Sequence, residues 1–123
     1  MARTKSQIVP RRGDVYLVLF DPSVGAEIRK TRPALVLQND VANRFSPITI
    51  VAAVTSKLDD TLYPTEVAIA KGEGGLVVDS VALLNQIRSI DRKRLVTRLG
   101  TVGGATMTRV ERALLVSLGL VDL

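Results

Sequence analysis

The stretch at residues 48–54, Ile-Thr-Ile-Val-Ala-Ala-Val, constrains the fold more than any other feature of the sequence. It is almost wholly apolar and rich in β-branched side chains, and polar residues stand on both sides of it. A short apolar run of this kind is typical of a strand that is buried on both faces. The sequence therefore predicts a β-sheet in which residues 48–54 form a central strand.

Further short strands are expected on both sides of that central strand. Apolar, β-branched or alternating runs predict them at residues 14–20, 33–38, 64–69, 81–84 and 86–90. Turn-forming residues separate these runs, as at Asp21-Pro22. We expect residues 39–47 to form a polar loop and residues 91–94 a charged turn.

The C-terminal part of the chain predicts a single helix. Its apolar side shows the spacing that places residues on one helical face: Val110, Ala113, Leu114, Ser117 and Leu118. Thr108 and Glu111 have the spacing of a capping box, Thr106 is an alternative cap, and Gly119 is expected to end the helix. Several short strands with one terminal helix indicate a mainly β fold with α, built as a small barrel-like or highly curved sheet.

The length of 123 residues fits one domain. Residues 1–12 carry several Arg and Lys side chains and predict a basic, flexible N-terminal arm, which leaves residues 13–123 as a single domain. No apolar run is long enough for a signal-peptide core or for a membrane span. We therefore expect a cytoplasmic protein.

The composition restricts the chemistry, because the chain contains neither histidine nor cysteine. Thiolate nucleophiles, disulfides, zinc sites built on Cys or His, and histidine-based ribonuclease chemistry are all excluded. Catalysis would have to use Arg, Lys, Asp, Glu, Ser, Thr or Tyr. The net charge of +5 favours a polyanionic partner, of which nucleic acid is one.

Two polar residues stand at the ends of predicted strands. Arg32 directly precedes the strand at 33–38, and Thr55 directly follows the central strand. If these strands are antiparallel neighbours, the guanidinium and the hydroxyl meet at one end of the sheet, where they could hold a phosphate. The alternative is that Arg32 is a solvated surface charge and that Thr55 is present because it is β-branched.

Several blocks carry a resemblance to a known family. In order along the chain they are Arg-Gly-Asp-Val-Tyr at 12–16, Asp-Pro at 21–22, Arg-Pro-Ala-Leu-Val-Leu-Gln-Asn-Asp at 32–40, Val-Ala-Ala-Val-Thr-Ser at 51–56, Pro-Thr-Glu-Val at 64–67, and Asp-Ser-Val-Ala-Leu-Leu-Asn-Gln-Ile-Arg-Ser-Ile-Asp at 79–91. Together they resemble the MazF/PemK family of toxin endoribonucleases from type II toxin–antitoxin systems. The resemblance covers nearly the whole chain.

The resemblance implies an SH3-like barrel of the CcdB/PemK type with a C-terminal helix, and a homodimer. It implies metal-independent and cofactor-independent cleavage of single-stranded RNA (mRNA) at short sequences, with 2′,3′-cyclic phosphate and 5′-hydroxyl ends. Such a toxin inhibits translation and growth until an acidic, MazE-like antitoxin covers its groove. The family's catalytic pair corresponds to Arg32 and Thr55.

The same resemblance suggests which residues contact RNA. Glu27, Asn39 and the Leu62-Tyr63-Pro64 loop would border the RNA groove, and the segment with Ser80, Asn85 and Gln86 resembles the one that reads bases. Asn85 stands where some family members carry an acidic residue, which leaves the recognised sequence open. Ser80 and Gln86 are equally explained as side chains that satisfy backbone groups at strand ends.

Three alternatives remain open at the level of sequence. A metal-dependent nuclease could use Asp14, Asp21 and Asp40, although these lack a recognised ligand spacing. A CcdB-like gyrase poison would share the fold but acts through a tail with Trp, which this chain lacks. A non-catalytic SH3-like module would bind without cleaving. The base that takes the proton from the RNA is also unassigned, with Glu27 or a water as candidates.

Overall fold

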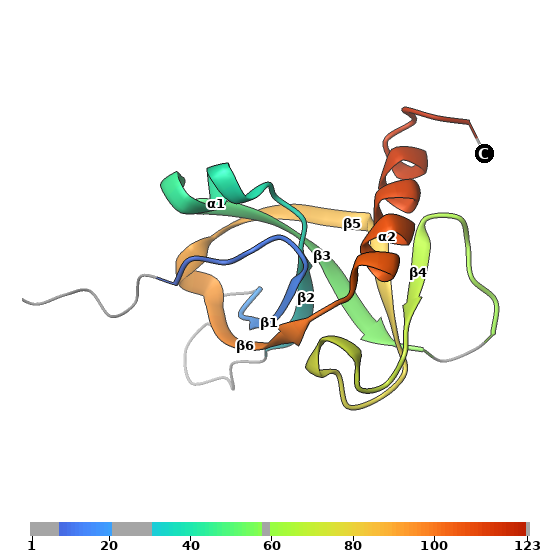
Figure 1. Ribbon diagram of the computed structural model, residues 1–123, viewed down its shortest axis with the longest axis horizontal. Coiled ribbons are helices and arrows are strands. Elements are labelled where there is room, and N and C mark those ends of the chain that lie inside the picture. Colours follow the sequence, from blue (N-terminus) through green and yellow to red (C-terminus); the bar gives the residue numbers. More distant parts are fainter. Residues whose placement is uncertain (1–7, 21–30, 58–59, 123) are drawn as a thin grey trace, which may run out of the picture.

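The computed structural model describes residues 8–20, 31–57 and 60–122, and its strands form one six-stranded antiparallel sheet (Figure 1). In chain order the strands are β1 (Asp14–Val18), β2 (Arg32–Val36), β3 (Ile48–Ser56), β4 (Glu66–Ile69), β5 (Ser80–Asp91) and β6 (Leu95–Thr101). Across the sheet their order is β4-β5-β3-β2-β1-β6. The helices are α1 (Asp40–Phe45) and α2 (Gly104–Ser117), and the short 3-10 turns are η1 (Glu73–Gly75) and η2 (Arg92–Arg94).

Strand β3 lies in the interior of the sheet, with β2 on one side and β5 on the other. Its neighbouring residues Val51 and Ala52 are both fully buried, and because successive side chains of a strand alternate, they are buried on opposite faces. The central strand predicted at residues 48–54 is therefore confirmed, as is the mainly β fold with a C-terminal helix.

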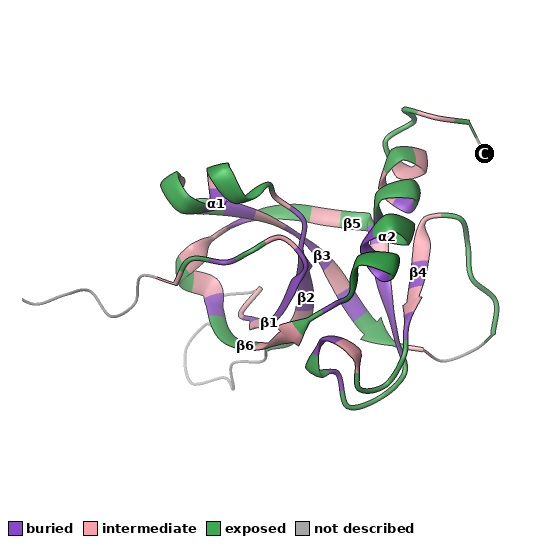
Figure 2. Ribbon diagram, in the orientation of Figure 1, coloured by how far each residue is buried: buried purple, intermediate pink, exposed green. Residues whose placement is uncertain are grey.

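Each face of the sheet carries its own apolar cluster. On one face, which we call the α2 face, Leu35 packs in a cluster with Val110 of helix α2. On the other face, Ala34 and Val51 belong to a second cluster. Arg32 is two residues from Ala34 and projects to that same side, so we call it the Arg32 face. Figure 2 shows how the buried stretches continue along the inner strands.

The sheet is curved but open, and β4 and β6 are its edges. Turn η1, which follows β4, packs against β6. A Cβ atom on Gly75 would collide with the backbone oxygen of Leu99, and one on Gly100 would lie 2.7 Å from the carbonyl carbon of Gly74. The two backbones are thus in direct contact, which only glycine permits. The predicted small barrel is in detail an open sheet with this turn packed on one edge.

Residues 40–45 form helix α1, where the sequence predicts only a polar loop. The Asn39 side chain caps the helix by accepting a hydrogen bond of 2.8 Å from the backbone N–H of Ala42. At the other end, the Arg92 guanidinium donates to the carbonyl oxygen of Ser46 at 2.9 Å. The prediction of a loop is wrong. A helix this short has too few positions to show a helical period of apolar residues in the sequence.

Strands β5 and β6 also differ from expectation. The two strands predicted at 81–84 and 86–90 are a single strand, β5, with a bulge: Ala52 pairs with Ile87, whereas Ala53 pairs with Leu83. The sequence pattern does not predict strand β6, which pairs with β1 at the edge of the sheet. The charged turn expected at 91–94 is present as η2, where the Asp91 side chain accepts from the N–H of Lys93.

Helix α2 lies where the pattern predicts it, but it begins differently. The predicted capping box is wrong, because Thr108 lies inside the helix and its hydroxyl donates to the carbonyl oxygen of Gly104. Thr106 also lies inside. The N-cap is Gly103, and its N–H donates to the carboxylate of Glu73 at 2.9 Å. A residue from a turn distant in sequence thus takes the place of a local cap.

The predicted basic arm is described only from residue 8 onward. In that part, Pro10 is buried and the Arg92 Nε donates to the carbonyl oxygen of Ile8 at 2.8 Å. Arg12 forms an ion pair of 2.7 Å with Glu111 of α2. The division into an arm and a domain at 13–123 stays a prediction. Within the described residues, neither helix has the length and apolar character needed to cross a bilayer.

Candidate functional site

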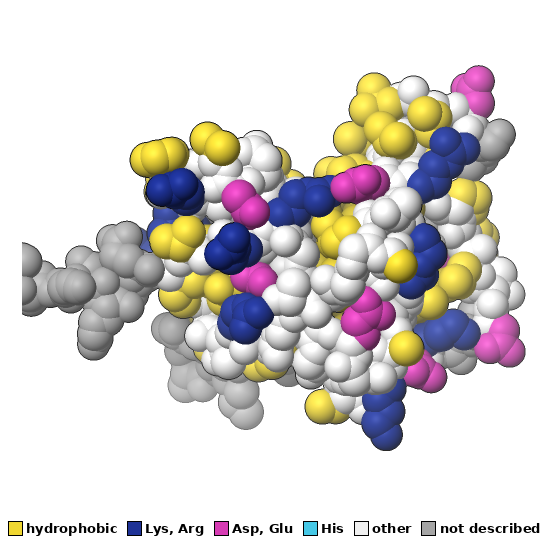
Figure 3. Space-filling model, in the orientation of Figure 1, with side chains coloured by type: hydrophobic (Ala, Val, Ile, Leu, Met, Phe, Trp, Pro, Cys, Tyr) yellow, Lys and Arg dark blue, Asp and Glu magenta, His cyan; other side chains and the backbone are white. Residues whose placement is uncertain are grey.

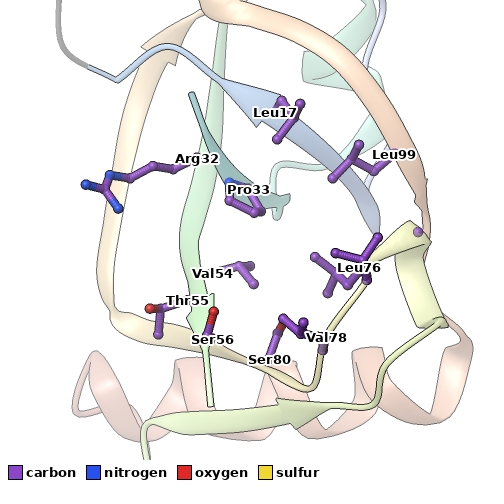
Figure 4. Close-up of a pocket in the computed structure, with 12 residues that line it drawn as sticks. Leu17, Arg32, Pro33, Val54, Thr55, Ser56, Leu76, Val78, Ser80 and Leu99 are labelled. Carbon is purple, nitrogen blue, oxygen red and sulfur yellow. The ribbon is translucent and has the colours of Figure 1, made fainter. Parts of the chain in front are cut away.

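The pairing of β2 with β3 brings the two predicted catalytic residues to facing positions. Ala34 is paired with Ala53, and Leu35 with Ala52, in antiparallel register. Continued to the strand ends, this register sets Arg32 opposite Thr55, and directly opposed residues project to the same face of a sheet. In Figure 4 both side chains project to one side of the two strands, while Pro33 lies on the other side.

The row of side chains that contains Arg32 and Thr55 is otherwise apolar. Val18 of β1 pairs with Arg32, and Val81 of β5 pairs with Thr55. Both valines are buried, whereas Arg32 and Thr55 are exposed. Within the described residues, no hydrogen bond or ion pair engages either polar side chain. The charged fork and the hydroxyl are therefore exposed and have no partner among residues 8–20, 31–57 and 60–122, which leaves their donors available to an anion.

Two cavities flank Thr55 and Ser56. The first, with a volume of about 390 Å³, opens on the side of Pro33; Arg32 and Thr55 border it, but their side chains point away from its mainly apolar walls (Figure 4). Those walls include Leu17, Pro33, Val54, Leu76, Val78 and Leu99. The second cavity, of about 240 Å³, lies on the other side and reaches Tyr63 and Glu66. Of the two hollows, the second therefore lies on the same face of the sheet as the Arg32 and Thr55 side chains, where it can take a part of an extended ligand.

A network around Glu73 fixes the turn that leads to the first cavity. The Glu73 carboxylate accepts hydrogen bonds from the Thr106 hydroxyl at 2.6 Å and from the N–H of Gly103 at 2.9 Å. These two bonds lower the pKa of Glu73 below its ordinary value of 4.5, and the bond from Thr106 has the larger effect. Because Leu76 follows this turn directly and lines the cavity, the network positions one cavity wall.

The residues predicted to contact RNA fall at different places. Leu62 and Tyr63 are exposed and line the second cavity, and Pro64 follows them in the same exposed loop. Ser80 is buried at the first cavity, where its hydroxyl donates to the carbonyl oxygen of Val78 at 2.9 Å. This bond agrees with the alternative that Ser80 satisfies a backbone group.

The remaining predicted contacts are less closely grouped. Asn85 and Gln86 are exposed in β5, in the bulge opposite Ala52 and Ala53. Asn39 caps α1 and stands at the end of β2 away from Arg32, roughly 20 Å along the strand. Glu27 lies outside the described residues, and so does Asp21. An RNA-binding role for these residues stays a prediction.

The carboxylates of the metal-nuclease alternative are already occupied by protein donors. Asp14 is buried and accepts from the N–H of Arg11 at 3.0 Å and from the Thr101 hydroxyl at 2.9 Å. Asp40 accepts from the N–H of Arg12 at 2.7 Å, and this bond lowers its pKa. Both stand at the opposite end of β1 and β2 from Arg32, so these two carboxylates cannot share a site with it.

Sequence reasoning missed two features of the Arg32 face. Glu66 of β4 lines the second cavity, and its position on this face follows from pairing across β5, which no local pattern reveals. Arg88 of β5 pairs with Val51, and its guanidinium carbon lies 5.1 Å from the centre of the Phe20 ring. That contact joins positions distant in sequence.

The chain is similar to known proteins over nearly its whole length. The family model of PemK-like, MazF-like toxins of type II toxin–antitoxin systems matches residues 11–118. Endoribonuclease EndoA of Bacillus subtilis strain 168 is 44% identical over 115 residues, which is 94% of this chain and 99% of that protein.

Solved structures from Deinococcus radiodurans share the fold. The MazE–MazF complex in form II has a chain that is 30% identical, with a TM-score of 0.76 over 93% of this chain and 99% of that one. MazF in form I is 31% identical, with a TM-score of 0.72 over 91% and 98% of the two chains. The family-model match at residues 11–118 includes both strands that carry Arg32 and Thr55.

Replacement of Glu73 tests the network that positions the cavity wall. The folded-state pKa lies below 4.5, so the carboxylate stabilises the fold above pH 4.5, and this contribution is lost as the pH falls through the folded pKa. Glu73→Gln should lower the free energy of unfolding at pH 7 by about 1 kcal/mol, since the site is partly solvated. Urea titrations at pH 7 and at low pH measure the difference.

The matched control is Glu111→Gln, which removes the carboxylate of the exposed ion pair with Arg12. It should cost at most about 0.5 kcal/mol at pH 7. If the free energy of unfolding of Glu73→Gln stays below that of wild type by the same amount well below pH 4, the carboxylate charge does not stabilise the network.

Proposed function

Because the chain belongs to the family of PemK-like, MazF-like toxins of type II toxin–antitoxin systems and is an endoribonuclease, we propose that it cleaves single-stranded RNA at a phosphodiester bound by Arg32 and Thr55. The observation that carries this proposal is the β2–β3 register, which sets these two exposed side chains opposite each other. Both donors lack a partner within the described residues.

The substrate is a strand whose bases are free to enter the second cavity, which lies on the same face as Arg32 and Thr55. An unpaired strand can place its phosphate at Arg32 and Thr55 and turn a base into that cavity, whereas the bases of a stiff duplex stay paired and stacked. The net charge of +5 favours a polyanion. On the face that Figure 3 shows, the Lys and Arg side chains are scattered among Asp and Glu.

The reaction uses the nucleophile that RNA itself carries. The 2′-oxygen attacks the adjacent phosphorus, the bond from phosphorus to the 5′-oxygen breaks, and the products are a 2′,3′-cyclic phosphate and a 5′-hydroxyl. The proton of the 2′-hydroxyl goes to a base, either Glu27 or a water, and the departing 5′-oxygen takes up a proton. Neither a metal nor a cofactor enters this sequence of steps. DNA is not cleaved, because it lacks the 2′-hydroxyl.

The two side chains stabilise charge that grows on the phosphate. Arg32 neutralises the non-bridging oxygens through its rigid fork of donors, and because its guanidinium stays protonated it is not the base. Thr55 donates its hydroxyl to a second oxygen or to the leaving group. Fixed donors aimed at developing charge supply a large part of catalysis in many enzymes, and alignment of the 2′-oxygen with phosphorus adds to it.

The cellular role follows from the family. The protein acts as a toxin in the cytoplasm, cleaves mRNA at short sequences, and so inhibits translation and growth. It forms a homodimer, and an acidic antitoxin covers its RNA groove. The MazE–MazF complexes of Deinococcus radiodurans support such a partner, and the positive charge of this chain suits an acidic one. The endoribonuclease relative favours this role over a gyrase poison or a binding module.

Substitution of either member of the proposed catalytic pair should slow cleavage strongly without unfolding the protein. Arg32→Ala should lower the turnover rate by about 10² to 10³, as deletion of one fixed donor does in other enzymes. Thr55→Ala should lower it by roughly 10- to 100-fold, the value of one hydrogen bond to a charged group. Initial rates on a fluorogenic RNA, with thermal unfolding in parallel, measure both effects.

Arg112→Ala on α2 and Thr97→Ala on β6 are the matched controls, since both residues are exposed and line neither cavity. Both should cleave at the wild-type rate. Full activity of Arg32→Ala would remove the proposed site.

Incubation of the pure protein with RNA of mixed sequence in EDTA tests the reaction class. We expect cleavage at a small set of sequences, with cyclic phosphate on one new end and hydroxyl on the other. A single 2′-deoxynucleotide on the 5′ side of the cut should block that cut, because it removes the nucleophile. Cleavage that stops in EDTA and returns with Mg²⁺ would favour the metal-dependent alternative instead.

A further inference from the structure

The second cavity, beside Thr55, has the size and lining of a site for one nucleobase. Its volume of about 240 Å³ lies below the roughly 300–1,000 Å³ of pockets that bury a whole drug-sized ligand. Its lining includes residues from β3, from β4 with the loop before it, and from β5: Thr55, Tyr63, Glu66, Val81 and Leu83.

The floor of this cavity is apolar and is set by the sheet. Val81 pairs with Thr55, and Leu83 pairs with Ala53, so both β5 side chains project to the same face as Thr55. Val81 is buried and Leu83 is half-buried. Two branched aliphatic side chains next to a phosphate-binding hydroxyl form a surface on which the flat face of a base can lie.

Tyr63 supplies an aromatic ring at the rim of the cavity. It lies in the loop before β4 and is 65% exposed, so its ring is accessible to a partner. Stacking of a base on an aromatic side chain contributes about 1–3 kcal/mol and is tolerant of base identity. Tyr63 can thus hold a base without selecting among the four.

Glu66 supplies the acceptor that can select. It pairs with Leu83, which pairs in turn with Ala53, and it therefore projects to the Arg32 face. One of its oxygens accepts a hydrogen bond from the N–H of Tyr63 at 3.1 Å, which fixes the carboxylate against the rim. Within the described residues the Glu66 carboxylate makes no other hydrogen bond, so further lone pairs of its oxygens remain for a ligand.

The distance between Glu66 and Thr55 suits a single nucleotide. They stand two strands apart and two residues apart along the strand direction, which corresponds to about 12 Å between their Cα atoms. Both side chains reach into the cavity between them. A nucleotide with its phosphate at Thr55 therefore brings the edge of its base to Glu66.

We propose that this cavity binds one base next to the scissile phosphate and that Glu66 selects a base with an amino group, namely adenine, cytosine or guanine. An ionised carboxylate only accepts hydrogen bonds, so it pairs with an exocyclic amino group, as Glu does with the amino group of cytosine in DNA readout. Uracil presents carbonyl oxygens at the corresponding position and is rejected. This inference rests on the proposed cleavage of RNA.

The test is the base preference of wild type and of Glu66→Gln on an RNA pool with randomised nucleotides on both sides of the cut. The amide keeps an acceptor for the N–H of Tyr63, but its other atom becomes a donor that can pair with uracil. Wild type should prefer amino-bearing bases over uracil by about 10-fold or more at one flanking position, the value of a hydrogen bond to a charged group. In Glu66→Gln this ratio should fall close to one at that position only.

Two further variants separate selection from general binding. Glu111→Gln, an equivalent change on α2, should leave every preference unchanged. Tyr63→Leu should weaken cleavage of all sequences by a similar factor and keep the wild-type preferences. Unchanged preferences in Glu66→Gln, or a wild-type preference for uracil on both sides of the cut, would overturn the inference while RNA cleavage itself stands. If the wild-type protein does not cleave RNA at all, the proposed function is overturned as well.

Discussion

The register between β2 and β3 is the constraint on which the rest of the structure depends. Ala34 faces Ala53 and Leu35 faces Ala52, and each strand buries side chains on both faces of the sheet. A slip by one residue would exchange the side chains of the two apolar clusters, so packing specifies the register strongly. The same register carries Arg32 to its place opposite Thr55. Apolar packing thereby positions the two polar groups of the candidate site.

Several charged side chains form hydrogen bonds to backbone groups that stabilise the fold, whereas the Arg32 side chain forms none within the described residues. Arg94 donates to the carbonyl oxygen of Leu19, Arg92 donates to that of Ile8, and Glu73 accepts from the N–H of the residue that precedes α2. These bonds tie loops and termini to the sheet. Arg32 and Thr55 have no comparable partner within the described residues and are exposed. A phosphate can therefore be bound there without breaking a bond that supports the fold, and a guanidinium forms strong, charge-assisted bonds to it.

The sequence predicts those features whose signal is local, and it misses those that depend on distant residues. The apolar run at 48–54 indicates the central strand, and Arg32 and Thr55 stand out because they border strands. The start of α2 could not be predicted, because the N–H of its N-cap, Gly103, is bound by Glu73, a residue 30 positions away. Helix α1 has one signal, the Asn39 cap, and is too short for a period. Glu66 joins Thr55 only through pairing across β5.

A crystal structure of the protein with a short RNA, made resistant by one 2′-deoxynucleotide at the cut, tests the central claim most directly. The account predicts that the scissile phosphate lies between β2 and β3, with hydrogen bonds from both the Arg32 guanidinium and the Thr55 hydroxyl to its oxygens. A phosphate bound elsewhere, or one that only a single member of the pair contacts, would contradict the claim that the strand register assembles the catalytic site.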